Sequence, residues 1–228
     1  MERNSDCWYV DTCEENCNNC LIYIQMKWQF DNSGLPKAKY KPISLTATNA
    51  TLKTFERLGA IRKDIDRFVK DGNNLYICGS TPGTGKTSWA IKMLQTYFHY
   101  NAVGNHGRVT GMFVSTTKLL LQLKDFQNPL PQEYKDNLLN ADVVIWDDIA
   151  VSGMSTYDYN QLFTIIDERI LNEKSNIFTS NCADKDTLVN SLGERLASRV
   201  WSTSEVIEIK GGDWRGRVAN NKQSIGDR

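Results

Sequence analysis

The sequence of 228 residues predicts an α/β fold in which helices flank a mostly parallel sheet. From residue 74 onward, short apolar segments bounded by turn formers alternate with longer segments of helical periodicity. Such alternation is typical of parallel strands joined by helical crossovers. The length allows one α/β domain with a sizeable core and a small additional module, but not two full domains.

The N-terminal part differs in composition from the rest. We expect residues 1–45 to form a cysteine-rich module and linker, and residues 46–228 to form the main domain. After Cys20, apolar spacing predicts a short helix stopped by the sequence GLP, and KAKYKPISLTATNAT predicts an extended, basic linker. From Leu52, apolar residues recur at helical spacing up to the sequence DG at 71–72, which predicts one amphipathic helix.

The remaining elements alternate along the chain. Strands are predicted at NLYICG, RVTGMFVST, ADVVIWDD and SNIFTSN, and helices at KTSWAIKMLQTYFHY, TKLLLQLKDF, YDYNQLFTIIDERILNEK and LGERLASRVW. Because the carboxyl ends of parallel strands meet at one edge of a sheet, polar residues after these strands are candidates for a common ligand site.

Charge and composition exclude several functional classes. Lys and Arg balance Asp and Glu at 27 each, so binding to nucleic acid or membrane must be local. Residues 37–70 hold nine basic and three acidic residues, which fits either a solvated helix face or a phosphate-contacting surface. We find no membrane span or signal peptide and expect a cytoplasmic protein without a membrane partner.

The sequence CGSTPGTGKTS at 78–88 is typical of a phosphate-binding loop, since it follows a predicted strand and opens a predicted helix. Glycines let backbone N–H groups point at phosphate oxygens beside the positive end of the helix. The formal pattern requires glycine at Ser80, but the glycine stands at Gly79. Lys86 would contact the β and γ phosphates of ATP, and Thr87 would bind Mg²⁺. The residues expected to bind the nucleotide here are Gly83, Thr84, Gly85, Lys86, Thr87 and Ser88.

Two further strand ends carry polar residues. VVIWDD ends in Asp147, placed to hold Mg²⁺, and Asp148, placed to orient or deprotonate the attacking water. NIFTSN ends in Asn181, which could bind that water or the γ-phosphate, or could belong to a helix cap. One helical turn separates Arg195 and Arg199, so both lie on one face, where they could be solvated or could reach a neighbour's γ-phosphate.

Four of the six cysteines lie close together near the N-terminus. Cys7, Cys13, Cys17 and Cys20 have no histidine nearby, and four thiolates suit tetrahedral Zn²⁺. So short a segment has too little core to fold without such a staple. The alternatives are free thiols, or three ligands and one spectator. Cysteines in a reducing compartment are seldom paired, and we expect the other two, Cys78 and Cys182, to be buried.

The order of the sequences GLPKAKY, LYICGSTPGTGKTSWA, GMFVSTTKLLLQLKDF, VVIWDDIA, IFTSN, LGERLASRV and GGDWR resembles the AAA+ helicase loaders of the DnaC and DnaI type, especially the short phage forms. The resemblance covers about residues 34–217. It implies an AAA+ P-loop ATPase that binds a hexameric replicative helicase, places it on single-stranded DNA (ssDNA) in replication initiation, and departs as ATP turns over. The location implied is the cytoplasm of a bacterial host.

The resemblance also implies roles for residues at the nucleotide. Lys86 and Thr87 resemble the Walker A pair, Asp147 and Asp148 the Walker B pair, and Asn181 sensor 1. Many AAA+ ATPases carry Glu where this chain has Asp148, and the shorter acid implies slow turnover. Some loaders hold the helicase with an N-terminal zinc module, which makes residues 1–45 the candidate helicase-binding segment.

Further roles concern neighbouring molecules. Arg195 and Arg199 lie in the segment similar to an arginine finger, and Arg215 matches the sensor 2 position at the nucleotide. A finger acts in trans, which implies self-association in a ring or spiral and poor hydrolysis by a monomer. In loaders the segment VSTTKLLLQLKDF lies near the ssDNA path, so Lys118 and Lys124 are candidate DNA contacts.

Two other functions remain open. A transposition helper ATPase of the IstB type shares the AAA+ core and acts on duplex DNA, whereas the short cysteine module favours a loader. A nucleotide-gated protein could bind the helicase without turnover, although the intact acidic pair and arginines argue against it.

Overall fold

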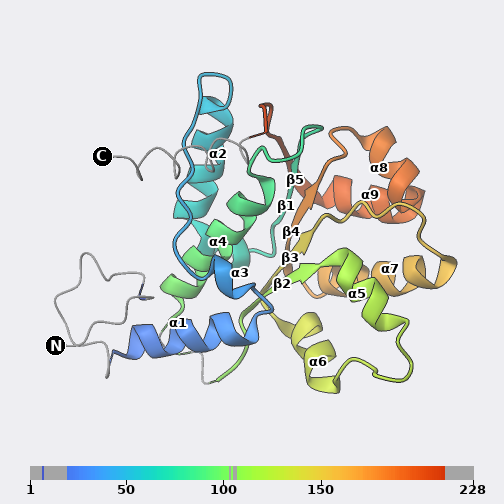
Figure 1. The fold of residues 1–228 in the computed structure, drawn as a ribbon, viewed down its shortest axis with the longest axis horizontal. Helices are drawn as coiled ribbons and strands as arrows, with labels where there is room; N and C mark the ends of the chain where they lie inside the picture. Colours follow the sequence, from blue (N-terminus) through green and yellow to red (C-terminus); the bar gives the residue numbers. More distant parts are fainter. Residues whose placement is uncertain (1–6, 8–19, 103, 105–106, 214–228) are drawn as a thin grey trace, which may run out of the picture.

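The computed structural model describes residues 7, 20–102, 104 and 107–213. At its centre is a five-stranded sheet in the order β2-β3-β4-β1-β5 (Figure 1). All neighbouring strands are parallel, which confirms the predicted α/β fold. β4 separates β1 from β3, the strands that precede the glycine loop and end in the acidic pair. The strands are β1 (Asn74–Cys78), β2 (Gly111–Ser115), β3 (Val143–Asp147), β4 (Ser175–Ser180) and β5 (Ser204–Glu208).

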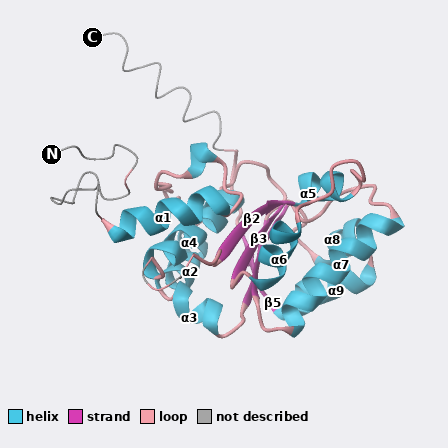
Figure 2. Ribbon diagram, turned by 90° about the horizontal axis from the view of Figure 1, so that it is seen from below, coloured by secondary structure: helices cyan, strands magenta, loops and turns pink. Residues whose placement is uncertain are grey.

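Helices cover both faces of the sheet (Figure 2). Strand side chains alternate between two cores, as the pleat requires: Leu75 and Ile77 of β1 enter one core, and Tyr76 and Cys78 enter the other. The first face carries α1 (Leu21–Asn32), α2 (Leu52–Lys63), α3 (Ile65–Lys70) and α4 (Lys86–Tyr100), and the second carries α5 (Thr116–Leu123), α6 (Gln132–Asn140), α7 (Thr156–Leu171), α8 (Lys185–Leu192) and α9 (Glu194–Thr203).

The segment from α1 to the linker is attached to the sheet by hydrogen bonds. The buried Gln29 side chain donates to the Arg108 carbonyl at 2.9 Å and accepts from the Thr110 amide at 3.1 Å. The Phe113 amide of β2 donates to the Ser33 carbonyl at 2.7 Å. Residues 21–33 are therefore anchored along β2. The division into 1–45 and 46–228 stays a prediction.

Most sequence-predicted elements lie where expected, with several differences. The single helix expected from Leu52 is wrong, because the chain breaks at Asp64 (φ −110°, ψ 29°) and forms α2 and α3. The linker contains one short 3₁₀ helix, η2 (Lys37–Lys39). Three elements were not predicted, namely α6, α8 and β5. β5 is an edge strand with one buried residue, Ile207, so its sequence lacks an apolar run.

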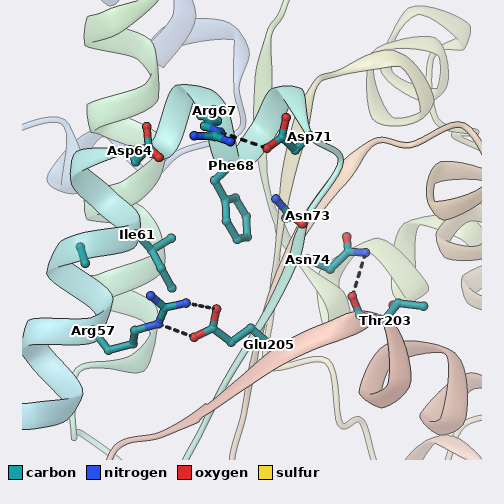
Figure 3. A pocket seen from close by; sticks show the side chains of 11 residues that line it. Arg57, Ile61, Asp64, Arg67, Phe68, Asp71, Asn73, Asn74, Thr203 and Glu205 are labelled. Atoms are coloured by element: carbon teal, nitrogen blue, oxygen red, sulfur yellow. Dashed lines mark hydrogen bonds and ion pairs between the residues drawn. The ribbon is translucent and has the colours of Figure 1, made fainter.

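Of the nine basic residues in segment 37–70, three form ion pairs with carboxylates of the chain, namely Arg57, Arg67 and Lys70. Arg57 forms a bidentate pair with Glu205 at 2.6 and 2.7 Å, and Arg67 lies 3.5 Å from Asp71 (Figure 3). These pairs line a groove of about 490 Å³ between α2, α3 and the starts of β1 and β5. Since the groove carries both signs of charge, its lining favours a solvated helix face over a phosphate-contacting surface at α2 and α3. Within the described part, no helix is both long and apolar enough to cross a membrane.

Arg169 of α7 is a fully buried cation that ties together the amino-terminal ends of β3 and β4. Its guanidinium donates to Asn176 Oδ1 at 2.8 Å and to the Ser175 carbonyl at 2.7 Å. It also donates to the carbonyls of Leu138 and Ala141 at 2.8 and 2.9 Å. Burial lowers the pKa of Arg169, and the surrounding oxygens accept hydrogen bonds from the charged form.

Replacing Arg169 with Met should lower the free energy of unfolding by about 3–5 kcal/mol, because several buried carbonyls lose their donors. Urea denaturation of the purified protein would measure this loss. Arg67→Ala is a matched control, since its ion pair is exposed and should contribute less than about 1 kcal/mol. Equal losses in the two variants would contradict a structural role for the Arg169 network.

Candidate nucleotide site

The glycine loop curls between β1 and α4 at the carboxyl edge of the sheet. Gly83 and Gly85 have φ values of +74° and +100°, which glycine adopts without the steric cost of a side chain. A Cβ at Gly83 would also collide with the Asp213 carboxylate. α4 begins at Lys86, so its N-terminal N–H groups and positive dipole end face the loop.

Lys86 extends into this curl. Its side chain is 6% exposed, and its ammonium donates to the carbonyls of Gly79 at 2.9 Å and Thr81 at 3.0 Å. The Lys86 ammonium is therefore held by carbonyls of the same loop that would bind the phosphates. This placement agrees with the predicted role of Lys86 at the β and γ phosphates, although the role itself stays a prediction.

Asp147, at the end of β3, is hydrogen-bonded to helix α4 and to strand β4. Its Oδ1 atom accepts hydrogen bonds from the Thr87 hydroxyl at 2.6 Å and the Thr179 hydroxyl at 2.8 Å. Thr87 opens α4, and Thr179 lies in β4, between the two predicted parts of the site. A hydroxyl beside a carboxylate is the oxygen donor set that Mg²⁺ prefers beside a nucleotide. Thr87 and Asp147 are therefore the residues that would hold Mg²⁺ beside the phosphates.

Asp148 turns the chain away from the sheet with an unusual backbone conformation. Its φ is +50°, in the left-handed region that non-glycine residues seldom adopt. The Asp148 amide donates to the Thr179 hydroxyl at 3.0 Å, which holds this conformation. Its side chain is exposed, as a group that contacts water requires. Such strain is concentrated at functional sites in proteins.

One cavity of about 390 Å³ brings the predicted nucleotide residues together. Asn181, which follows β4, lies there beside the acidic pair. The cavity also includes Lys39 of η2, which sequence reasoning placed in the basic linker but not at the nucleotide. The lining residues are Lys39, Pro82, Gly83, Thr84, Gly85, Lys86, Thr87, Ser88, Asp147, Asp148 and Asn181.

Thr179 is the second residue that sequence reasoning missed as part of the site. It is fully buried and bridges both aspartates through its hydroxyl. The available signal was a polar residue near the carboxyl end of a predicted strand. Its importance depends on β4 lying between β1 and β3, and the sequence does not specify that order.

Arg195 and Arg199 share one face of α9, as predicted, and both contact α7. The Arg195 guanidinium lies 4.7 Å from the centre of the Phe163 ring, and Arg199 Nε lies 2.6 Å from Asp167 Oδ1. Both arginines line a separate hollow of about 360 Å³. This hollow shares no residue with the nucleotide cavity.

The two predicted DNA contacts differ in their surroundings. Lys118 is exposed on α5. Lys124 pairs with Asp158 at 2.6 Å, and the Asp158 side chain is only 3% exposed. Asp158 also forms the capping box of α7 with Ser155. Lys124 thus has a partner within the chain, and DNA binding by the two lysines stays a prediction.

The zinc hypothesis falls mostly on residues that are not described. Cys13 and Cys17 lie outside the described residues, as does Arg215. Among the residues that are described, which include Cys7 and Cys20, no group of three or more His, Cys, Asp or Glu is arranged to hold a metal. Cys78 is fully buried, as expected, and burial raises the pKa of its thiol to about 12. Cys182 is half-buried.

Replacing Thr179 with Val should weaken binding of ATP with Mg²⁺ by about tenfold, because a hydrogen bond to a charged group is lost. Thr179→Ser keeps the hydroxyl and should bind within about threefold of the wild type. Titration with a fluorescent ATP analogue, in Mg²⁺ and in EDTA, would measure both variants. An affinity for Thr179→Val equal to that of Thr179→Ser would show that the bridge does not order Asp147.

The fold is similar to those of replication proteins. The crystal structure of the DnaC helicase loader is 22% identical, with a TM-score of 0.60, and the match covers 73% of this chain and 94% of that one. The crystal structure of DnaI is also 22% identical, with a TM-score of 0.60, and the match covers 79% of this chain and 94% of that one. The structure of the replication initiator DnaA bound to AMPPCP and single-stranded DNA is 20% identical, with a TM-score of 0.52. That match covers 79% of this chain and 53% of the DnaA chain. At these identities the comparison shows the fold alone, and it confirms the expected AAA+ P-loop core.

The family comparison covers most of the chain. No curated protein sequence matches it. The family described as IstB-like ATP binding protein matches residues 46–222, which include the glycine loop, the acidic strand end and the α9 arginines. The chain therefore belongs to the family of IstB-like ATP binding proteins.

Proposed function

We propose that this protein is an ATPase that loads a hexameric replicative helicase of the DnaB type onto single-stranded DNA during replication initiation. The observation that carries this proposal is the hydrogen-bonded set of Thr87, Asp147 and Thr179 beside the glycine loop. It joins a phosphate-binding element to a metal-binding carboxylate within one cavity. ATP and Mg²⁺ are the ligands that fit this combination.

Hydrolysis requires an oriented water and stabilisation of charge on the γ-phosphate. Lys86 supplies positive charge at the phosphates, and Asp148 orients or deprotonates the water from the exposed corner after β3. Asn181 lies in the same cavity and can bind the water or the γ-phosphate. Arg215 is proposed to reach the nucleotide from the C-terminal segment.

Arg195 and Arg199 complete the site of a neighbouring subunit. Two facts support this assignment: both arginines are accessible from outside, and their hollow is separate from the nucleotide cavity of the same chain. A ring or spiral of protomers would bring this face against the next cavity. The isolated chain should then hydrolyse ATP slowly, and assembly or ssDNA should stimulate it.

The partners are inferred from fold and motif together. Two similar folds, DnaC and DnaI, include one described as a helicase loader, and DnaA is described as bound to single-stranded DNA. We propose that Lys118 and Lys124 contact ssDNA phosphates. Residues 1–45 are the proposed helicase contact, with Zn²⁺ held by Cys7, Cys13, Cys17 and Cys20. Such an activity belongs in the bacterial cytoplasm.

A second candidate is a transposition helper ATPase of the IstB type, which the family description, IstB-like ATP binding protein, supports. Both functions use the same nucleotide chemistry, so the ATP cavity cannot separate them. A nucleotide-gated helicase-binding protein without turnover is the third candidate. The strained, exposed Asp148 argues against it, because a protein that only binds ATP gains nothing from a positioned acid.

We expect slow ATP hydrolysis by the wild type and loss of about 100-fold or more of that activity in Lys86→Ala and in the double variant Arg195→Ala, Arg199→Ala. Mixing the two inactive variants should restore part of the activity, since each supplies what the other lacks. Phosphate release assays at increasing protein concentration would measure this. A mixture as inactive as its components would exclude the arginines as trans-acting residues, and equal rates for wild type and Lys86→Ala would exclude the ATPase.

A loader should co-purify with a replicative helicase and deliver it to ssDNA in an ATP-dependent manner, whereas a transposition helper should bind duplex DNA and leave helicase unbound. Pull-down with candidate helicases, followed by binding to ssDNA and duplex DNA, would separate the two. Metal analysis of the same complex, with Cys17→Ser as a matched variant, would test for about one Zn²⁺ per chain. Duplex binding without helicase binding would overturn the loader proposal.

A further inference from the structure

The nucleotide cavity includes one residue from outside the family domain. Lys39 lies in η2, seven residues before the start of the family match at residue 46. It is the second lysine of a cavity that otherwise contains Lys86 as its cation and Asp147 and Asp148 as its acids. Lys86 is buried and its ammonium is hydrogen-bonded to carbonyls of the loop, whereas Lys39 is exposed.

The backbone on either side of Lys39 is held in place by α4. The buried Gln95 side chain donates to the Lys39 carbonyl at 2.6 Å and to the Lys41 carbonyl at 3.1 Å. Gln95 belongs to the helix that opens with Lys86 and Thr87, so one rigid element positions both the glycine loop and η2. Farther along, a Cβ at Gly85 would lie 3.6 Å from Leu45 Cδ2, so the linker also packs against the loop.

The residues on both sides of η2 are also attached to the rest of the fold. Tyr40 stacks on Phe30 of α1 with ring centres 5.1 Å apart, and its hydroxyl donates to the Phe30 carbonyl at 3.0 Å. Ser33 accepts from the Phe113 amide of β2. Residues 33–45 therefore run from the edge of the sheet to the nucleotide loop, and Lys39 is the residue of this segment that lines the cavity.

A cation at this position has a clear electrostatic use. The phosphates of ATP carry several negative charges, and a lysine at this position would add to the attraction supplied by Lys86, Mg²⁺ and the N–H groups of the loop. A lysine is a flexible point charge that can reach a phosphate oxygen from a fixed backbone. Among the described residues, no hydrogen bond or ion pair engages the Lys39 ammonium, so a phosphate would not have to displace another partner.

We propose that Lys39 binds the phosphate chain of the nucleotide and that the nucleotide thereby tethers residues 33–45 to the ATPase core. The inference rests on the proposed function and adds a regulatory connection to it. The segment tethered in this way belongs to residues 1–45, the proposed helicase contact. Occupancy of the nucleotide site would then add a contact to a segment that Gln95 and Tyr40 already attach to the core, and would connect that segment to the nucleotide.

The test compares Lys39→Ala with Lys39→Arg, which keeps the charge, and with Lys37→Ala, a neighbouring lysine outside the cavity. Titration with a fluorescent ATP analogue in Mg²⁺ should show affinity reduced about tenfold for Lys39→Ala and within about threefold of wild type for the other two. Raising the salt concentration should reduce the difference in ATP affinity between Lys39→Ala and the wild type, because salt screens an exposed contact between lysine and phosphate.

Hydrogen exchange provides a second readout. In the wild type, ATP with Mg²⁺ should slow amide exchange in residues 33–45, and in Lys39→Ala this protection should be lost even at saturating ATP. Thermal denaturation without nucleotide should be the same for all variants. Equal affinities and equal protection in Lys39→Ala and Lys37→Ala would overturn the inference while leaving the ATPase intact. A wild-type protein that does not bind ATP would overturn both.

Discussion

The geometry of the nucleotide site depends on one pair of short hydrogen bonds to Asp147 Oδ1. Thr87 reaches this atom from the first turn of α4, and Thr179 reaches it from β4. The contact is possible only because β4 is inserted between β1 and β3, so that three strand ends meet at one edge. Parallel strands whose side chains are buried on both faces hold these ends in register.

Polar groups also organise the fold at the amino-terminal ends of the strands, away from the nucleotide site. Arg169 and Asn176 satisfy carbonyls and side chains at the amino-terminal ends of β3 and β4. Asn176 in turn accepts from the Trp146 indole at 3.0 Å. The strands that carry the acidic pair and Thr179 are therefore fixed at both ends, which limits how far the site can distort.

Local patterns predicted the elements closest to the chemistry. The run KTSWAIKMLQTYFHY matches α4, and VVIWD matches β3, because apolar periodicity and turn chemistry act within a few residues. The break at Asp64 and the edge strand β5 depend on tertiary packing, so no local pattern revealed them. The same holds within the site. The glycine loop and acidic pair are contiguous motifs, whereas Thr179 and Lys39 reach the cavity only through strand order and the fixation of the linker by Gln95.

The left-handed backbone conformation of Asp148 restricts which acidic side chain can occupy this position. Asp and Asn adopt positive φ more readily than longer side chains, because their short polar groups can bond to the nearby backbone. A Glu at the same position would extend the carboxylate by one methylene but would meet a greater conformational penalty. The backbone at this position thus favours a short acidic side chain. Asn could replace Asp148 with little change in backbone conformation while removing its charge.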